Sequence, residues 1–540
     1  MLRRAGRTIA QIGLMLAAAL AVAPAVAHAS GQLQVAAQPP LYPAFDTGIH
    51  YYVSRCANSQ VQLTITVPAG TTISVDGQPA QSGTSFSTQV SLNEGQEFLI
   101  DWTSNSSTET YHVRCLPTDF PDWTSTQSAG TAQAQYLVVT PAQNFSSPEP
   151  PYAAVFDANG VPRWWFNEGP QPIDAKALPN GDLAWTEFGS GGPFEERSPD
   201  GTLVRTYPPS GSDPTDVHDL QILPNGDYVV AVDAQRTIDA VTCGGSPSTT
   251  ITDPVIQELD STGALLFAWD TASHIPITEV SPGWFSQCAS GDPYHFNSVE
   301  VDTDGNIIVS FRHLDAIYKI DVSTSAVIWK LGGVPTTNSL TISGDPDCTP
   351  GNCQDFSGQH DARVFTDASS GQTFLTLHDN GTDLSRAPRA LRFSVDTGAR
   401  TATLVESVSD PNVTGSPCCG SARKLPGGDW LVDWGGTNSI EELPAGFSAG
   451  NAVFTLTLSG VFSYRAHPVT SADYGDALTV GMNTQYPRSP QDGGPPSNIP
   501  EAPAVSLLAV AAAGAVSYVV LRSRRYVPGR FATDQRFIQR

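Results

Sequence analysis

Alternating apolar and polar side chains mark short strands in the first quarter of the chain. Residues 61–67 read Val-Gln-Leu-Thr-Ile-Thr-Val, so every second side chain is apolar, as in a strand that buries one face. Similar runs occupy residues 72–75, 86–92 and 97–102, and each is bounded by Gly, Asn or Ser. Strands at this spacing are typical of a small antiparallel sandwich. We therefore expect residues 31–125 to form a small β-sandwich module.

A longer pattern repeats between residues 136 and 480. The phrase Leu-Pro-Asn-Gly-Asp at residues 178–182 recurs at 223–227, and related phrases occur at 301–307 and 424–430. Asn-Gly-Asp fits a tight hairpin turn, because glycine readily takes a positive φ. Between copies lies an Asp-x-x-Gly turn followed by a strand with Trp or Phe. Paired hairpins at this spacing are typical of the blades of a β-propeller, whose loops converge around a central channel.

The two ends of the chain carry apolar segments. Residues 1–30 combine three early arginines, an apolar run and small residues near the end, which predicts a signal peptide rather than the alternative, a first transmembrane helix. Residues 504–521 carry no charge and are long enough to cross a bilayer as a helix. Arginines follow at once, which predicts a cytoplasmic tail at 522–540. The Pro-rich residues 485–503 read as a stiff linker. We expect an extracytoplasmic body anchored to the cell membrane by the C-terminal helix.

Charge and cysteine content narrow the class of protein. The formal net charge of -25 argues against nucleic acid as a partner. Eight cysteines in an exported protein favour disulfides over a metal site. We pair Cys56 with Cys115, and Cys243 with Cys288. The remaining four, at 348, 353, 418 and 419, either close as two local pairs or cross-link their two loops.

Three histidines occupy the same place in successive repeats. His218, His295 and His360 each stand just before a predicted strand, so they should point to the same end of the propeller axis. Arg312 follows His295 by one strand and should end nearby. A lone histidine would more readily have a structural role, but repetition favours a shared pocket. A neutral imidazole is a capable nucleophile, and flanking cations stabilise the charge that spreads over oxygens in sulfuryl or phosphoryl transfer.

Several phrases, in the right order, resemble the arylsulfotransferase family. They are Tyr-His-Phe-Asn-Ser-Val at 294–299, Ser-Phe-Arg-His at 310–313, Ile-Tyr-Lys-Ile-Asp at 317–321, Ile-Trp-Lys-Leu-Gly-Gly at 328–333, Phe-Ser-Gly-Gln-His-Asp-Ala-Arg at 356–363 and Leu-His-Asp-Asn-Gly at 377–381. This resemblance implies a six-bladed propeller that moves a sulfuryl group from an aryl sulfate to a phenol by a ping-pong route, without PAPS.

The resemblance also assigns roles to individual residues. It implies that His360 is the transiently sulfated nucleophile, and that His218, His295 and Arg312 bind the sulfuryl oxygens or assist the leaving group. Further substrate-binding candidates are Arg363, His378 and Arg389.

Two other functions fit the same loops: an aryl-sulfate hydrolase in which water discharges the intermediate, and a non-catalytic surface propeller that binds a ligand or partner. The chain has no phosphate-binding Gly-rich loop with Lys-Ser/Thr, so we expect no PAPS and no other cofactor. We expect no metal in the site. Asp-rich turns leave calcium as an alternative, although residues 302–306 lack the distal Glu of an EF-hand. The patterns predict no oligomeric state.

Overall fold

The computed structural model describes residues 32–484 except 57–59, 84, 129, 144–151, 168, 348–354, 368–369, 385 and 448–450. The predicted signal peptide, linker, membrane span and tail lie outside these ranges. Within them, no helix combines the length and the apolar composition needed to cross a bilayer.

Residues 33–116 form two sheets that share one core. The first sheet has the order β1 (Gln34–Gln38), β4 (Gln60–Thr66), β6 (Phe86–Ser91). The second has the order β2 (Leu41–Tyr42), β3 (Tyr51–Arg55), β8 (Ser107–Leu116), β7 (Glu97–Ser104), β5 (Thr72–Val75). The alternation in β4 buries Val61, Leu63 and Ile65 completely. All four strands expected from the pattern are present. One expectation is corrected: β3 and β8 pair in parallel, so the module is not wholly antiparallel.

The rest of the described chain forms six sheets of four or five strands. Their orders, starting each time from the strand on the inside except in the first, are β12 (Pro162–Phe166), β11 (Ala153–Asp157), β10 (Ala134–Ala142), β34 (Phe462–Thr470); β13 (Pro172–Ala177), β14 (Leu183–Glu187), β15 (Phe194–Arg197), β16 (Leu203–Tyr207); β17 (Thr215–Ile222), β18 (Tyr228–Ile238), β19 (Thr249–Leu259), β20 (Leu265–Asp270); β21 (Phe296–Val301), β22 (Ile307–Phe311), β23 (Ala316–Ile320), β24 (Val327–Gly332); β26 (His360–Thr366), β27 (Thr373–Asp379), β28 (Arg389–Asp396), β29 (Thr401–Val408), β25 (Thr341–Ser343); and β30 (Ser421–Lys424), β31 (Trp430–Asp433), β32 (Ser439–Leu443), β33 (Phe454–Leu458), β9 (Trp123–Gln127).

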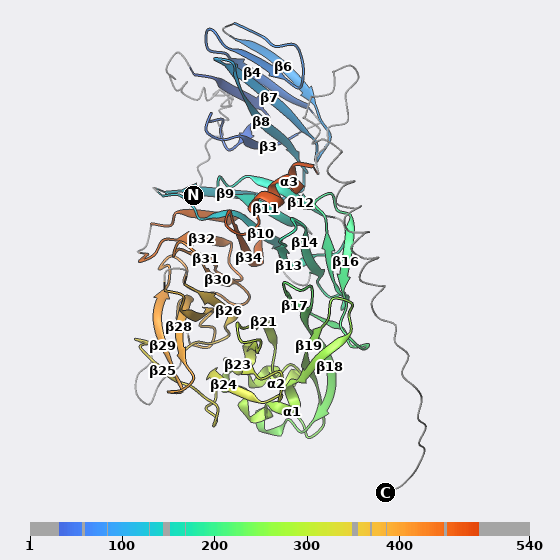
Figure 1. The fold of residues 1–540 in the computed structure, drawn as a ribbon, viewed down its shortest axis with the longest axis vertical. Helices are drawn as coiled ribbons and strands as arrows, with labels where there is room; N and C mark the ends of the chain where they lie inside the picture. Colours follow the sequence, from blue (N-terminus) through green and yellow to red (C-terminus); the bar gives the residue numbers. More distant parts are fainter. Residues whose placement is uncertain are drawn as a thin grey trace, which may run out of the picture. The chain divides into compact units, whose positions relative to one another are not determined.

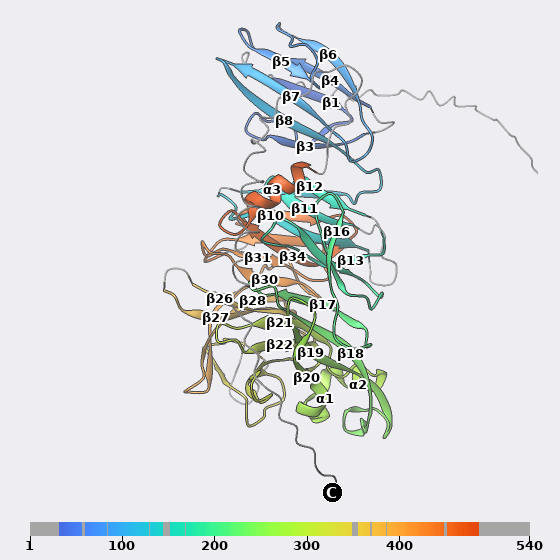
Figure 2. The same cartoon turned by 45° about the vertical axis from the view of Figure 1, so that its right-hand side comes forward.

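The inner strands of these sheets form a closed ring. β13 contacts β17, β17 contacts β21, β21 contacts β26, β26 contacts β30, β30 contacts β34, and β34 returns to β13. Figure 1 shows the six sheets arranged around this ring, and Figure 2 shows the same strands after rotation. The late strand β34 pairs with the early strand β10, so one sheet joins both ends of the ring. The all-β, propeller-like architecture that the repeats predict is therefore present.

The repeated Gly positions form the expected tight turns. Gly181 and Gly226 have φ of 88° and 87°, and each donates its N–H to the carbonyl of the leucine three residues earlier. The alternative calcium ligands at the third repeat, Asp302 and Asp304, are both bound by Nζ of Lys319, at 2.6 and 2.7 Å.

The described residues also form three α-helices, α1 (Thr271–His274), α2 (Phe285–Ser290) and α3 (Gly475–Thr484), and several short 3-10 helices. Both disulfides predicted with a definite pairing are present, Cys56–Cys115 and Cys243–Cys288. Of the two pairings left open, the local one applies to the adjacent cysteines, because Cys418 is bonded to Cys419. The other two cysteines, at 348 and 353, lie outside the described residues.

A buried guanidinium lies where the inner strands meet. The side chain of Arg465 on β34 has no exposed surface and donates to Oδ1 of Asp174 on β13, at 2.9 Å. It lies 3.7 Å from Asp219 on β17 and 3.5 Å from Asp361 on β26. It also donates to the backbone carbonyl oxygens of His218, at 2.8 Å, and Asn297.

The carboxylates around Arg465 are ionised. Burial alone would raise the pKa of Asp174, but Lys176 and Arg465 hold it well below its usual value. Burial opposes ionisation of Asp361 in the same way, and Arg423, Arg363 and Arg465 outweigh it. A network of this kind is strongly destabilised when one charged partner is removed, because the remaining charges stay buried.

We expect Arg465→Met to lower the free energy of unfolding by about 3–5 kcal/mol, because it leaves buried carboxylates short of a cation. Denaturant unfolding followed by tryptophan fluorescence measures the change. The control is Arg55→Met, which removes an exposed ion pair with Asp122 and should change stability by less than about 1 kcal/mol. Equal losses in the two variants would contradict the assigned role of Arg465.

Candidate active site

Three of the inner strands bring a histidine to the same end of the ring. His218 lies in β17, His295 directly precedes β21, and His360 begins β26. At this end of all three strands the pairing with the next strand shifts register. Bulges of this kind turn side chains away from the regular alternation of a strand. His295 itself adopts a left-handed backbone conformation, with φ of 52°.

His360 is buried, with 2% of its surface exposed, and both ring nitrogens are hydrogen-bonded. Nδ1 lies 2.9 Å from the carbonyl oxygen of Gly358 and 2.8 Å from Oδ1 of Asn380, which both accept. Nε2 accepts the backbone N–H of Cys419 at 3.2 Å. A ring that donates at Nδ1 and accepts at Nε2 is a neutral imidazole with its lone pair on Nε2.

The electrostatic surroundings keep this imidazole neutral. Burial lowers the pKa of His360 well below its ordinary value, and the positive charges of Arg312 and Arg465 lower it further. The hydrogen bond to Asn380 acts in the opposite direction but is outweighed. At neutral pH, Nε2 of His360 is therefore unprotonated, which is the form that attacks an electrophile.

His218 and His295 form two histidine–carboxylate pairs side by side. Their ring centroids are 5.0 Å apart. Nδ1 of His218 lies 2.8 Å from Oδ1 of Asp216, and Nδ1 of His295 lies 2.6 Å from Oδ2 of Asp292. Each carboxylate fixes a proton on Nδ1 and leaves Nε2 for a ligand. The two side chains are 20% and 27% exposed, so, unlike His360, they can be reached from solvent.

The carboxylate of Asp216 keeps His218 protonated to higher pH. Burial alone would lower the pKa of His218, but the charge and hydrogen bond of Asp216 outweigh it and raise the pKa above its ordinary value. Burial likewise opposes ionisation of Asp292, yet His295, His313 and His218 lower the pKa of this carboxyl group. A histidine that stays protonated to higher pH can donate a proton to a departing oxygen.

Arg312 supplies a guanidinium without a carboxylate partner. It begins the short 3-10 helix η5 (Arg312–Leu314), and its guanidinium carbon lies 4.3 Å from the ring centroid of Trp284. Nη2 donates to the carbonyl oxygen of Pro417 at 2.9 Å, and Nη1 lies 3.2 Å from Nε2 of His313. No carboxylate in the described part of the chain forms an ion pair with it, and its Nε is buried without an acceptor. Such a cation is well suited to an anionic ligand.

Asp292, His295 and His313 also lie close enough together to be considered as metal ligands, but their bonds argue against it. Nδ1 of His313 donates to the backbone carbonyl of Asp292 at 2.7 Å, and Nε2 faces Arg312. Both nitrogens of this histidine are therefore occupied, and a guanidinium stands beside the cluster. A cation at this place would be repelled.

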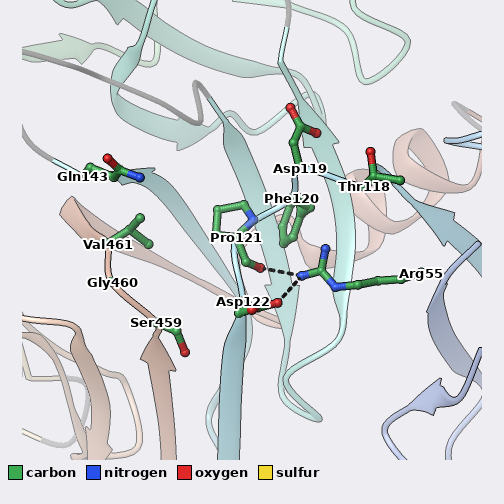
Figure 3. Close-up of a pocket in the computed structure, with 10 residues that line it drawn as sticks. All are labelled: Arg55, Thr118, Asp119, Phe120, Pro121, Asp122, Gln143, Ser459, Gly460 and Val461. Carbon is green, nitrogen blue, oxygen red and sulfur yellow. Dashed lines mark hydrogen bonds and ion pairs between the residues drawn. The ribbon is translucent and has the colours of Figure 1, made fainter. Parts of the chain in front are cut away.

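Two cavities among the described residues are lined by none of His218, His295 and His360. One, of about 390 Å³, is shown in Figure 3, where Arg55 reaches the backbone carbonyl of Pro121 and the carboxylate of Asp122. The other, of about 710 Å³, is lined by residues from all the inner strands, including Lys176, Arg363 and Arg423. Its cations already bind buried carboxylates such as those of residues 219 and 361. The histidine cluster therefore lies outside both cavities.

A profile of the arylsulfotransferase (ASST) family matches residues 183–457, slightly more than half of the 540 residues. The matched range contains His218, His295, Arg312 and His360. The chain belongs to the arylsulfotransferase family.

The solved structures that resemble this chain are distant from it in sequence. They include a protein of unknown function from Bacteroides caccae (11% identity, TM-score 0.37, covering 62% of this chain and 99% of that chain), hydrazine synthase from Kuenenia stuttgartiensis (12%, 0.34, 74% and 96%) and virginiamycin B lyase from Staphylococcus aureus (11%, 0.30, 79% and 100%). At these scores the likeness carries no argument about function. No curated protein matches the chain.

Of the three substrate-binding candidates, His378 is the one that stands opposite His360 on the neighbouring strand. Its Nε2 is 3.1 Å from Oγ of Ser416, in the segment that covers His360. His378 is fully buried, and burial lowers its pKa to about 3. Its side chain hydrogen-bonds the covering segment and has no exposed surface, so it is not placed to bind a ligand.

The structure does not bring Arg363 and Arg389 to the histidine cluster, because carboxylates hold both. Arg363 binds Asp219 at 2.7 Å and Asp361 at 2.8 Å, in the network around Arg465. Arg389 binds residues 345 and 379, at 2.9 and 3.0 Å. Guanidinium groups that are already neutralised in buried ion pairs have little to offer a sulfuryl group.

Sequence reasoning missed the groups that orient the histidines. Asp216 and Asp292 stand two and three residues before their histidines, a spacing that could have singled them out. Asn380 lies within one of the family phrases but was assigned no role. Cys419 was considered only as a disulfide partner, and no local signal places its N–H on His360.

Proposed function

We propose that this arylsulfotransferase transfers a sulfuryl group from an aryl sulfate to a phenol through a sulfated His360, in a ping-pong reaction. The observation that carries the proposal is the state of His360: a neutral ring whose proton is on Nδ1 and whose lone pair is on Nε2. The unpaired Arg312 and the two histidine–carboxylate pairs supply the complementary cation and acids.

In the first half-reaction, Nε2 of His360 attacks the sulfur of the aryl sulfate. The N–S bond forms as the bond between sulfur and the aryl oxygen breaks, and the electron pair of that bond goes to the departing oxygen. Arg312 and His295 stabilise the charge on the sulfuryl oxygens. His218 donates its Nε2 proton to the phenolate. The proton on Nδ1 of His360 stays between Asn380 and the carbonyl of Gly358.

In the second half-reaction, a phenol takes the place of the first product. Neutral His218 removes the proton of the phenol, and the phenol oxygen attacks the sulfur of sulfated His360. The N–S bond breaks, and its electron pair returns to Nε2. Every proton lost in one half-reaction is regained in the other, so the transfer needs neither PAPS nor any other cofactor.

We further propose that the six sheets are the six blades implied by the family resemblance, and that the body is exported and anchored by the segment at 504–521. Support for export comes from the three disulfides among the described residues, which persist in oxidising compartments. Small-molecule aryl sulfates and phenols are the proposed partners.

Assays with 4-nitrophenyl sulfate test the reaction. We expect nitrophenol release by the wild type to depend on added phenol. His360→Gln should abolish release, and Arg312→Met should lower kcat/KM by about 100-fold or more, because it removes a cation that stabilises the transition state. The matched control, Arg205→Met, changes an arginine outside the cluster and should leave the rate unchanged. Release by the wild type that ignores phenol would indicate hydrolysis, and equal rates in wild type and His360→Gln would refute the nucleophile.

The leaving group tests the role of His218. Phenolate is a poorer leaving group than 4-nitrophenolate, so it depends more on a proton donor. We expect His218→Gln to lower kcat/KM for phenyl sulfate by about 100-fold and to affect 4-nitrophenyl sulfate far less. Because the pKa of His218 is raised, the rate with phenyl sulfate should persist at neutral pH and fall as rising pH removes the proton. Equal losses with both substrates would show that His218 is no acid.

A further inference from the structure

The segment from Ser416 to Gly420 contacts His360 directly through Cys419 and indirectly through Asn380. The backbone N–H of Cys419 donates to Nε2 of His360 at 3.2 Å. On the other side of the ring, Nδ2 of Asn380 donates to Oγ of Ser416 at 2.8 Å and to the carbonyl oxygen of Cys419 at 3.1 Å. These two bonds orient the amide so that its Oδ1 faces Nδ1 of His360. One segment therefore acts on both ring nitrogens.

The disulfide between consecutive residues fixes the shape of this segment. A bond between Cys418 and Cys419 closes a small ring that includes their shared peptide, so few conformations remain open to it. Cys419 is 1% exposed and adopts a left-handed conformation, with φ of 60°. Outside such a ring, this conformation is unfavourable for a residue with a side chain.

The turn at Gly435 and Gly436 packs closely against the disulfide-closed segment. A Cβ atom on Gly435 would lie 2.1 Å from the carbonyl oxygen of Cys418, and one on Gly436 would lie 2.7 Å from Cγ of Pro417. Pro417 in turn accepts the hydrogen bond from Arg312. The position of the segment is thus set by a covalent ring, by close backbone packing and by the unpaired cation of the site.

The bonds that the segment makes determine the form of His360. An N–H that points at Nε2 is compatible only with a lone pair on that atom. A carbonyl-type oxygen at Nδ1 is compatible only with a proton there. If the segment relaxed, both tautomers and the protonated ring would become accessible. The bond from Cys419 is the one hydrogen bond that Nε2 accepts, so an attacking Nε2 has to release it.

We propose that the disulfide-closed segment from Ser416 to Gly420 is the positioning element of the nucleophile, and that aryl sulfotransfer by this chain requires the Cys418–Cys419 bond. The inference rests on the proposed function of His360. The segment acts through Asn380 and through its own backbone, so Cys418 and Cys419 are positioning residues and their thiols take no part in the transfer.

The test compares Cys418→Ser/Cys419→Ser with Cys56→Ser/Cys115→Ser, which removes a disulfide in the N-terminal module. We expect the first double variant to lose about 10- to 100-fold in kcat/KM, the usual cost of losing a group that orients a reacting side chain. Its acid limb should move to higher pH, because the N–H that opposes protonation of Nε2 is gone. The control should keep the wild-type pH profile and rate.

A second measurement does not depend on a folded variant. Cys418 is partly exposed, whereas the cysteines of the other two described disulfides are buried, so mild reductant should open Cys418–Cys419 first. Alkylation and peptide mapping identify the opened bond in the folded wild-type protein, and reoxidation should restore the rate.

The outcomes separate this inference from the proposed function. An active wild type whose rate and acid limb are unchanged after opening the Cys418–Cys419 bond, by substitution or by reduction, overturns the positioning role and leaves the function of His360 intact. A wild type that transfers no sulfuryl group overturns both. Loss of rate with the acid limb shifted, reversed on reoxidation, supports the inference.

Discussion

The structure depends on one buried cation that joins the inner strands. Arg465, on the last strand of the ring, binds Asp174 on the first and approaches Asp219 and Asp361 on two others. Its remaining donors reach the backbone of His218 and Asn297. Asp219 and Asp361 directly follow His218 and His360 in the sequence, and His218 itself accepts through its backbone carbonyl. The guanidinium that links the inner strands therefore also anchors the backbone near His218, His295 and His360.

The same charges decide the protonation of the histidines. Arg465 and Arg312 add to burial in holding His360 neutral, whereas a carboxylate at Nδ1 raises the pKa of His218. These two histidines, on inner strands separated by β21, are thus suited to the opposite roles proposed for them, His360 as a nucleophile and His218 as an acid. This division matches the chemistry of an arylsulfotransferase, in which a neutral nitrogen attacks while a departing oxygen needs a proton.

The sequence predicted those features that depend on local patterns. The alternation in residues 61–67 located strand β4, the repeated Asn-Gly-Asp turns located the hairpins, and the spacing of His218, His295 and His360 placed all three at the starts of successive inner strands. Features that depend on long-range contacts could not be predicted from the sequence. β3 pairs in parallel with β8, and Arg363 forms an ion pair with Asp219. Both contacts join residues far apart in the chain, and the local sequence around each partner does not indicate them. The bond from Cys419 to His360 is a backbone contact, which leaves no mark in side-chain patterns.

The most direct test of the account is the mass of the protein after brief mixing with an aryl sulfate in the absence of phenol. We expect the intact protein to gain the mass of one sulfuryl group, peptide mapping to place it on His360, and added phenol to remove it. Turnover in the presence of phenol without any such adduct, or an adduct that persists in His360→Gln, would contradict the claim that Nε2 of His360 carries the group.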